Sequence, residues 1–219
     1  MPPMTKKVAS FPPQVADGCR LLVLGTVPSL RSLEMRQSYA HPHNLFWPFM
    51  GVLYDAGPDL PYAERIARLH AAGVGIWDVL KHCERPGSLD SSIRPESEVP
   101  NDIPGLLDAH PTIRAIALNG AKAQQVFARR IGARIRSERL TDVEILALPS
   151  TSPANASIPR AVKLERWREL LRYAAPTPSQ AGKFSAARAG TRRGGKVLVC
   201  SGQRTDTSQA NHQSKGDSA

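Results

Sequence analysis

Residues 39–47 combine the side-chain types of a ligand pocket. Three large aromatics, two histidines and Asn44 fall within nine positions of a chain that is only 5% aromatic. Histidine and asparagine are disfavoured in fully buried positions, so core packing alone does not explain this mixture. A pocket for a flat polar ring needs an aromatic surface beside groups that donate and accept hydrogen bonds. We therefore interpret this stretch as one wall of a nucleobase pocket.

The elements that would position this wall can be predicted from apolar patterns. Short apolar runs at residues 20–25 and 74–80 predict buried strands, and those at residues 113–118 and 143–148 predict a third and a fourth strand. Amphipathic patterns, or patterns that end at a helix-terminating glycine or proline, predict helices over residues 48–57, 62–72, 102–109, 121–131 and 159–173. Residues 30–38 and 81–100 show no apolar period and are expected to be loops. This alternation predicts the α/β class, as a three-layer α/β/α sandwich around a central four-stranded, largely parallel sheet.

The predicted sheet brings separate polar segments to one place. In open α/β sheets, ligands bind beyond the carboxyl ends of the strands. Residues 25–29, Asp78 and residues 150–155 each lie at or after the end of a predicted strand. We therefore expect them at one edge of the sheet, beside residues 39–47.

Composition divides the chain into a domain at residues 1–175 and a basic tail at residues 176–219. The tail has seven Lys and Arg against two Asp, which is half of the net charge of +10. It is rich in Pro, Ser, Thr and Gly, and we expect it to be disordered. The positive charge favours a nucleic-acid partner, although many basic proteins carry only solvated charge.

The cysteines and the hydropathy pattern exclude several classes of protein. Cys19, Cys83 and Cys200 are widely spaced and in no metal-ligand pattern, so neither a zinc site nor a disulfide framework is expected, and no cofactor is predicted. The N-terminus has no hydrophobic signal core, and no apolar run approaches the roughly 20 residues that cross a bilayer. We expect a soluble, cytoplasmic monomer with no membrane partner.

Three motifs together resemble the uracil-DNA glycosylase superfamily. They are GTVPS at residues 25–29, YAHPHNLFW at residues 39–47 and LPSTSPAN at residues 148–155. The similarity covers residues 10–175 and is greatest to the hypoxanthine (deoxyinosine) DNA glycosylase branch. It implies a base-excision repair enzyme that flips a deaminated nucleotide out of double-stranded DNA and hydrolyses its N-glycosidic bond, leaving an abasic site. The alternatives are a uracil- or mismatch-specific glycosylase on the same scaffold, and a catalytically silent nucleic-acid-binding relative.

The resemblance assigns catalysis to Asn44. Many relatives orient the attacking water with an Asp or Asn that corresponds to Val27, and some use a histidine that corresponds to Ser150. These departures fit the hypoxanthine branch, in which the asparagine of the His-Pro-x-Asn segment is implicated. An amide can hold a water but is a poor general base, so stabilisation of the departing base must contribute most. The alternative is that Asn44 caps the next helix, but a helix starting at Pro48 would begin too late for that.

Substrate contacts follow from the same resemblance. Tyr39 takes the ring-stacking position, the alternative being a core aromatic. Asp78 could accept the N1–H of hypoxanthine, a donor that adenine lacks, or could simply cap a loop. The expected substrate-binding residues are completed by Gly25, Thr26, Ser150, Ser152 and Asn155, although Ser and Thr in such loops often only form turns.

Contacts to DNA outside the pocket are expected from five residues: Ser29, His41, Ala154, Arg160 and Lys163. Ala154 and Asn155 stand where relatives insert a wedge into the vacated base stack, and the small Ala154 predicts weak wedging. Arg160 and Lys163 lie on the last predicted helix and would attract phosphates, although a charged helix face is often merely solvated. His41 is either structural or phosphate-facing.

Overall fold

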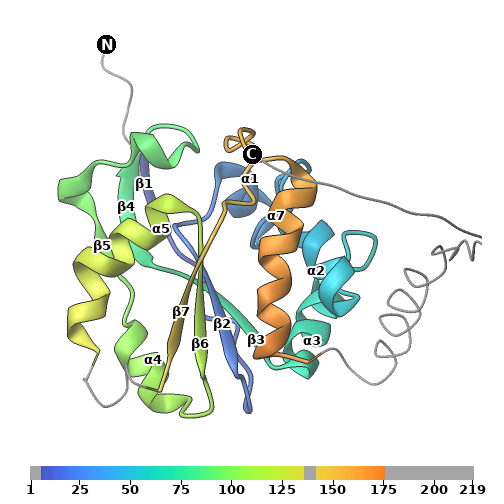
Figure 1. Cartoon of the computed structure of the whole chain (residues 1–219). Helices are drawn as coiled ribbons and strands as arrows, with labels where there is room; N and C mark the ends of the chain where they lie inside the picture. Colours follow the sequence, from blue (N-terminus) through green and yellow to red (C-terminus); the bar gives the residue numbers. More distant parts are fainter. Residues whose placement is uncertain (1–5, 136–141, 176–219) are drawn as a thin grey trace, which may run out of the picture.

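A parallel four-stranded sheet forms the middle layer of the computed structural model, which describes residues 6–135 and 142–175 (Figure 1). Its strand order is β3 (Val74–Asp78), β2 (Leu21–Gly25), β6 (Ala115–Asn119) and β7 (Glu144–Leu148). Leu21 pairs with Val74 on one side and Ala115 on the other, and all three strand pairs are parallel. The predicted sheet is therefore confirmed, while the prediction for residues 176–219 lies outside the described residues.

Side-chain alternation along β2 explains the two flanking layers. Leu21 and Val23 face a core that includes α2 (Phe46–Tyr54), α3 (Tyr62–Ala72) and α7 (Arg160–Trp167). Leu22 and Leu24 face the opposite core, with α4 (Ile103–Ala109) and α5 (Ala121–Val126). All four β2 side chains are fully buried. Figure 1 shows the helices on the two sides of the sheet, which confirms the α/β/α sandwich.

The expectation of a loop over residues 81–100 is wrong in part. A second sheet, antiparallel and in the order β1-β4-β5, contains β1 (Lys6–Ala9), β4 (Leu80–Arg85) and β5 (Val99–Pro100). Two 3-10 turns, η1 (Asp90–Ser92) and η2 (Pro95–Ser97), connect β4 to β5. The sequence pattern failed because β4 buries Arg85 as well as Leu80 and Cys83, so its inward face does not read as apolar.

Helix boundaries differ from the predictions at several points. Residues 30–38 were expected to form a loop but contain a short helix, α1 (Leu30–Met35), whose N-terminus is capped by the Ser29 hydroxyl accepting from the Ser32 N–H at 3.2 Å. The helix α2 begins at Phe46, two residues before Pro48. After α5 the chain continues as a π-helical turn (Phe127–Ile131) and a 3-10 turn (Gly132–Arg134), while the 3-10 turn η5 (Arg168–Arg172) follows α7. Within the described ranges, no helix has the length and apolarity needed to span a membrane.

Candidate functional site

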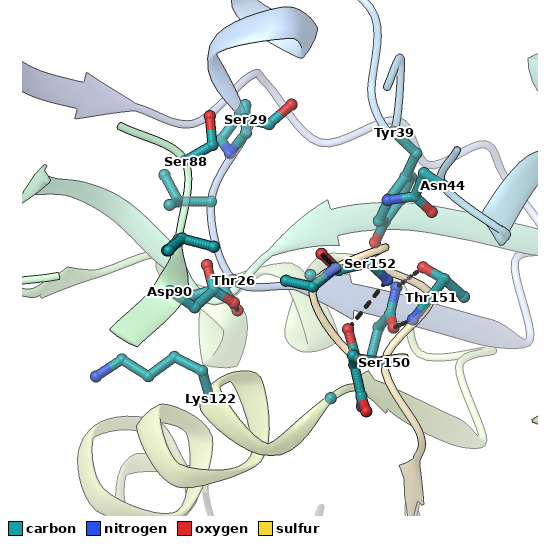
Figure 2. Close-up of a pocket in the computed structure, with 18 of the residues that line it drawn as sticks. Thr26, Ser29, Tyr39, Asn44, Ser88, Asp90, Lys122, Ser150, Thr151 and Ser152 are labelled. Atoms are coloured by element: carbon teal, nitrogen blue, oxygen red, sulfur yellow. Dashed lines mark hydrogen bonds between the residues drawn. The ribbon is translucent and has the colours of Figure 1, made fainter. Parts of the chain in front are cut away.

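A cavity of about 290 Å³ lies at the carboxyl ends of the parallel strands (Figure 2). Its size is near the lower end of the range of about 300–1,000 Å³ for small-molecule pockets. Every strand of the sheet contributes, because parallel strands end at the same edge. Gly25 ends β2 and residues 26–29 follow it, Asp78 ends β3, Asn119 ends β6, and residues 150–155 follow β7. Tyr39 and Asn44 add a wall from the segment before α2.

Most of the residues predicted from the sequence meet in this cavity. Those that line it are Gly25, Thr26, Ser29, Tyr39, Asn44, Asp78, Ser150, Ser152, Ala154 and Asn155. Three others, His41, Arg160 and Lys163, are outside the lining. The His41 ring nitrogen Nδ1 accepts from the His43 N–H at 3.2 Å, which is a local turn contact, and Arg160 is exposed at the start of α7.

The aromatic wall is supported from behind. The ring of Tyr39 stacks on Phe46 with centroids 3.9 Å apart and planes inclined by 18°. Phe46 is fully buried and contacts the rings of Trp47 and Trp167 edge-on, at 5.0 and 6.0 Å between centroids. One face of Tyr39 is thus covered by Phe46, and the residue still lines the cavity. Tyr39, the residue predicted to stack on the base, therefore forms a wall of the cavity that is packed against the core through Phe46.

The Tyr39 hydroxyl is buried and makes no hydrogen bond of standard geometry among the described residues, although the Asn119 side chain is close enough to lower its pKa slightly. Burial and the nearby charge of Asp78 raise the pKa of the Tyr39 hydroxyl, so it stays neutral at physiological pH. Tyr39 also has a left-handed backbone conformation, with φ of 57°, which is uncommon for a residue other than glycine. A buried hydroxyl left without a partner costs about 1–3 kcal/mol, and residues held in unfavourable conformations are frequent in binding sites.

Gly25 leaves the space that brings Asp78 and Tyr39 together. A Cβ atom on Gly25 would lie 2.7 Å from Asp78 Oδ1 and 2.9 Å from Tyr39 Oη, closer than carbon can approach either atom. The Asp78 carboxylate accepts from Ser10 Oγ at 3.4 Å, while the Asp78 backbone carbonyl accepts from Asn101 Nδ2 at 2.8 Å. Burial, together with the charge of Asp90, raises the pKa of Asp78 to about 7. This carboxylate therefore changes charge near neutral pH.

The side-chain oxygen of Asn44 accepts from the backbone N–H of Phe46 at 2.9 Å. The expectation that the helix starts at Pro48 is wrong, because Phe46 is the first residue of α2. The N-cap position is Leu45, which makes no side-chain cap, and Asn44 binds the first helical N–H from the residue before it. The alternatives are nevertheless compatible, because Asn44 lines the cavity as well. A backbone donor also fixes which amide atom is the oxygen. That oxygen keeps a second lone pair, and the amide nitrogen supplies two donors.

The loop after β7 is held by a network at its base. The Asn119 side chain donates to Thr151 Oγ1 at 2.9 Å and accepts from the Thr151 N–H at 3.0 Å. The Thr151 carbonyl accepts from the Leu45 N–H at 2.9 Å, which ties this loop to the segment that carries Asn44. Gly120 has φ of +97°, and a Cβ there would lie 2.7 Å from the Ser150 Cβ. Asn119 was not among the predicted site residues, because its side chain looked like a turn signal.

Ser150 and Ser152 take part in turns within this loop. The Ser150 hydroxyl accepts from the Ser152 N–H at 3.1 Å, and the Ser152 hydroxyl accepts from the Ala154 N–H at 3.3 Å (Figure 2). The turn-forming alternative therefore describes their contacts within the protein. Both hydroxyls can still donate their own hydrogen toward the cavity that they line.

Lys163 requires a correction. It is only 2% exposed, and its ammonium donates to the carbonyl of Ser150 at 2.8 Å and to the carbonyl of Asn155. Burial lowers the pKa of Lys163. An ammonium held beneath the loop by two carbonyls is not presented to a DNA phosphate, so we reassign Lys163 from DNA contact to support of residues 150–155.

A second carboxylate, Asp90, was not among the predicted site residues. Asp90 lines the cavity, and its Oδ2 accepts from Thr26 Oγ1 at 2.7 Å while its Oδ1 lies 3.6 Å from the guanidinium of Arg85. Arg85 is 1% exposed. Burial raises the pKa of Asp90 and lowers that of Arg85, and each charge partly offsets the shift of the other. In Figure 2, Asp90 and Thr26 lie across the cavity from Tyr39 and Asn44. The position of Asp90 depends on how the loop after β4 folds. The sequence of that loop has no apolar periodicity from which its fold could be predicted.

No cluster of three or more His, Cys, Asp and Glu residues suited to a metal ion occurs in the part of the chain that the structure describes. The cavity is lined by the carboxylates of Asp78 and Asp90, three asparagine amides, several hydroxyls, the side chains of Arg85 and Lys122, and the aromatic wall of Tyr39. Such a set can hold a planar polar ring, stabilise positive charge and position a water.

Comparison with known proteins gives consistent matches. A family model described as the Uracil DNA glycosylase superfamily matches residues 12–171. The chain is 32% identical over 166 residues to a hypoxanthine DNA glycosylase of Methanosarcina acetivorans, covering 74% of this chain and 97% of that protein. It is 34% identical over 120 residues to a hypoxanthine DNA glycosylase of Methanosarcina barkeri, covering 53% and 73%. The solution structure of a candidate uracil DNA glycosylase of M. acetivorans superimposes with a TM-score of 0.62 at 30% identity, covering 76% of this chain and 98% of the other.

Proposed function

Because the chain belongs to the uracil DNA glycosylase superfamily, we propose that it is a monofunctional DNA glycosylase that excises deaminated bases, with hypoxanthine as its main substrate. The proposed substrate is double-stranded DNA that contains the damaged base, and the proposed product is an abasic site. We also propose that the protein acts as a monomer, because residues at the ends of all four strands of one chain line the same cavity.

The observation that carries this proposal is the position of Asp78 in a cavity with an aromatic wall. Deamination of adenine replaces an amino group by a carbonyl and places a hydrogen on N1. The ionised Asp78 carboxylate can accept that N1–H, whereas the bare N1 of adenine would leave a buried charge without a partner. Hydrogen bonds to charged groups contribute about 1.5–3 kcal/mol, and leaving such a group unpaired costs more. Asp78 would therefore favour the deaminated base.

Asn44 would hold the attacking water. Its oxygen is fixed by the Phe46 N–H, which leaves one lone pair on the oxygen and two donors on the amide nitrogen for the cavity. An amide held by the start of a helix is preorganised, and positioning of this kind contributes to rate without a change of protonation state. Because an amide is a weak base, the water must lose its proton late, after the base has begun to leave.

Asp90 would supply the negative charge that the first motif lacks at Val27. Cleavage of an N-glycosidic bond develops positive charge on the sugar, as in other glycosyl transfers with oxocarbenium-like transition states. A carboxylate in a partly buried cavity stabilises that charge more strongly than it would in water. Its contact with Thr26, the residue before Val27, brings the Asp90 carboxylate next to the first motif from a different segment of the chain.

The test is excision from duplexes that differ in one nucleotide. Duplexes with inosine, uracil or adenine at the same position are incubated with the protein, and abasic sites are read as alkali-labile strand breaks. We expect cleavage at inosine, less at uracil and none at adenine, with Asn44→Ala purified in parallel to exclude a contaminating enzyme. Cleavage at uracil alone would assign the uracil branch instead. Binding without any cleavage would leave the silent relative as the correct description.

A further inference from the structure

Leu89 is an exposed apolar side chain at the mouth of the cavity. It is 53% exposed, and it lines the cavity together with its neighbours Ser88 and Asp90. Five other large apolar residues among those described are also exposed, namely Met35, Val52, Val99, Ile145 and Val162, but these five do not line the cavity. Single exposed apolar residues are common on protein surfaces, so the exposure of Leu89 has meaning only because of its position.

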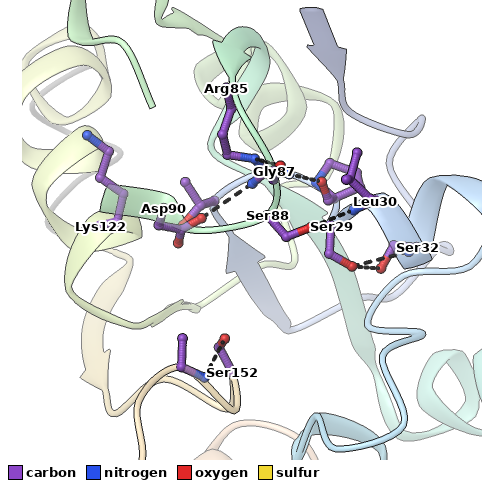
Figure 3. Close-up of polar contacts among 12 residues, drawn as sticks. Ser29, Leu30, Ser32, Arg85, Gly87, Ser88, Asp90, Lys122 and Ser152 are labelled. Atoms are coloured by element: carbon purple, nitrogen blue, oxygen red, sulfur yellow. Dashed lines mark hydrogen bonds and ion pairs between the residues drawn. The ribbon is translucent and has the colours of Figure 1, made fainter. Parts of the chain in front are cut away.

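The backbone around Leu89 is braced against the first motif (Figure 3). The buried guanidinium of Arg85 donates to the carbonyl of Pro28 at 2.7 Å and to the carbonyl of Gly87 at 3.1 Å. The Ser88 hydroxyl accepts from the Leu30 N–H at 3.1 Å.

The residue after Leu89 is tied down as well. Asp90 accepts from Thr26 at 2.7 Å and lies 3.6 Å from Arg85, and the Leu89 carbonyl accepts from the Ser92 N–H at 3.0 Å. The backbone is therefore held on both sides of Leu89, while its side chain is left in solvent. These contacts fix the direction in which the Leu89 side chain leaves the backbone, although that side chain is half exposed and not part of the core.

A glycosylase that flips a nucleotide must also deal with the gap left in the base stack. Proteins that open base steps insert apolar side chains such as Leu, Ile, Phe or Met between them. Ala154 occupies the place from which relatives are expected to insert a wedge, and it offers only a methyl group. Ala154 and Leu89 both line the cavity, so a wedge can approach the mouth from the loop between β4 and η1 instead.

We propose that Leu89 is the wedge that enters the stack vacated by the flipped nucleotide. This inference rests on the proposed function and adds to it a residue that acts in flipping rather than in bond cleavage. Insertion would offset part of the lost stacking, and it would slow the return of the base into the duplex. The requirement for Leu89 should therefore exist only where the base begins in a stacked and paired state.

The experiment compares Leu89→Ala, Leu89→Met and Val162→Ala with the unmodified protein. Val162 is the matched control, because it is 52% exposed and lies on α7 away from the cavity lining. Single-turnover excision of inosine is measured in a duplex and in an unpaired bubble. Flipping is followed separately by the fluorescence of 2-aminopurine placed next to the inosine, in an Asn44→Ala background that preserves the DNA.

For Leu89→Ala we expect a fall of about 10-fold or more in the duplex rate, equivalent to ~1.4 kcal/mol, and less than about 2-fold in the bubble, where little stacking has to be broken. Leu89→Met should retain the duplex rate, and Val162→Ala should change neither. The fluorescence rise should be reduced by Leu89→Ala while binding of DNA persists.

An unchanged duplex rate and fluorescence rise in Leu89→Ala would overturn the proposal. So would an equal fall on both substrates, because that would indicate a structural role. If the unmodified protein excises inosine from neither substrate, the proposed function fails first, and the wedge fails with it. If the unmodified protein excises inosine from the bubble and Leu89→Ala does not change the excision rate in the duplex, the proposed function stands and only the proposed role of Leu89 is refuted.

Discussion

Asp78 should make inosine excision depend on pH in the neutral range. Burial raises the pKa of its carboxyl from an ordinary 3.8 to about 7, and the charge of Asp90 adds to this shift. The Ser10 hydroxyl and the Arg85 guanidinium oppose it. If the ionised form accepts the N1–H of hypoxanthine, the active fraction falls about tenfold for each pH unit below 7, which is 1.36 kcal/mol per unit. At pH 6 the single-turnover rate should therefore be about a tenth of its plateau.

The variant Asp78→Asn removes this titration. Its amide oxygen can still accept a hydrogen bond, but without charge, and neutral hydrogen bonds contribute about 1 kcal/mol less than charge-assisted ones. We expect the rate at pH 8 to fall by about fivefold and the slope between pH 5 and pH 7 to disappear. The assay is single-turnover excision with enzyme in excess, at constant ionic strength, so that weaker DNA binding does not imitate a change of rate. A pH profile that is identical in the two proteins would refute the assignment.

The same carboxylate predicts an effect on stability with a defined sign. Between about pH 4 and pH 7 the folded protein binds a proton at Asp78 that the unfolded chain does not. The free energy of unfolding contributed by this residue therefore falls as pH rises through that window and is constant above it. Three pH units correspond to an upper limit on the order of 4 kcal/mol. Thermal unfolding should accordingly show Asp78→Asn to be more stable than the unmodified protein at pH 8, with a smaller difference near pH 4.

Three other substitutions test separate parts of the site. Asn44→Ala should lower single-turnover excision by about 100-fold or more through lost water positioning, while gel-shift assays show that DNA binding remains. Asp90→Asn keeps the shape but removes the charge, and it should lower the same rate by about 10²-fold; a loss of affinity without a loss of rate would contradict its role. Gly25→Ala forces a Cβ against Asp78 and Tyr39, so we expect lost excision and an overpacking cost of about 1–3 kcal/mol in denaturant unfolding.

The central sheet could be predicted because its inner strands are continuous apolar runs. Each residue of β2 is buried, so the strand reads as a continuous apolar run that ends in Gly25. The strand β4 is different, since its buried positions include Arg85, and a buried guanidinium looks like a surface residue in a sequence. Its partners, the carbonyls of Pro28 and Gly87 and the carboxylate of Asp90, are contacts that only the folded chain creates.

The site was predictable where a residue lies at the end of a strand. Gly25 and Asp78 are adjacent in the register of β2 and β3, so the prediction of strands already places them together. Leu89 and Asp90 belong to a turn whose sequence has no apolar periodicity. Their place in the cavity depends on hydrogen bonds between residues 85–90 and residues 26–30. Asn44 illustrates a third case. The sequence offered helix capping and catalysis as alternatives, whereas the structure allows one amide to bind the helix and to line the cavity.

Lys163 shows why charge is a weak guide to the DNA surface. A lysine on the last helix of a basic protein would be assigned to phosphate binding by its charge alone, yet this ammonium lies under the loop that it supports. The same helix face carries Trp167, whose indole N–H donates to the carbonyl of Pro149 at 2.9 Å. Two turns of α7 therefore hold residues 149–155 through hydrogen bonds to their carbonyls. The packing of α7 against the sheet thus determines where that loop lies at the cavity. The role of this helix in DNA repair would then be to fix the shape of the pocket.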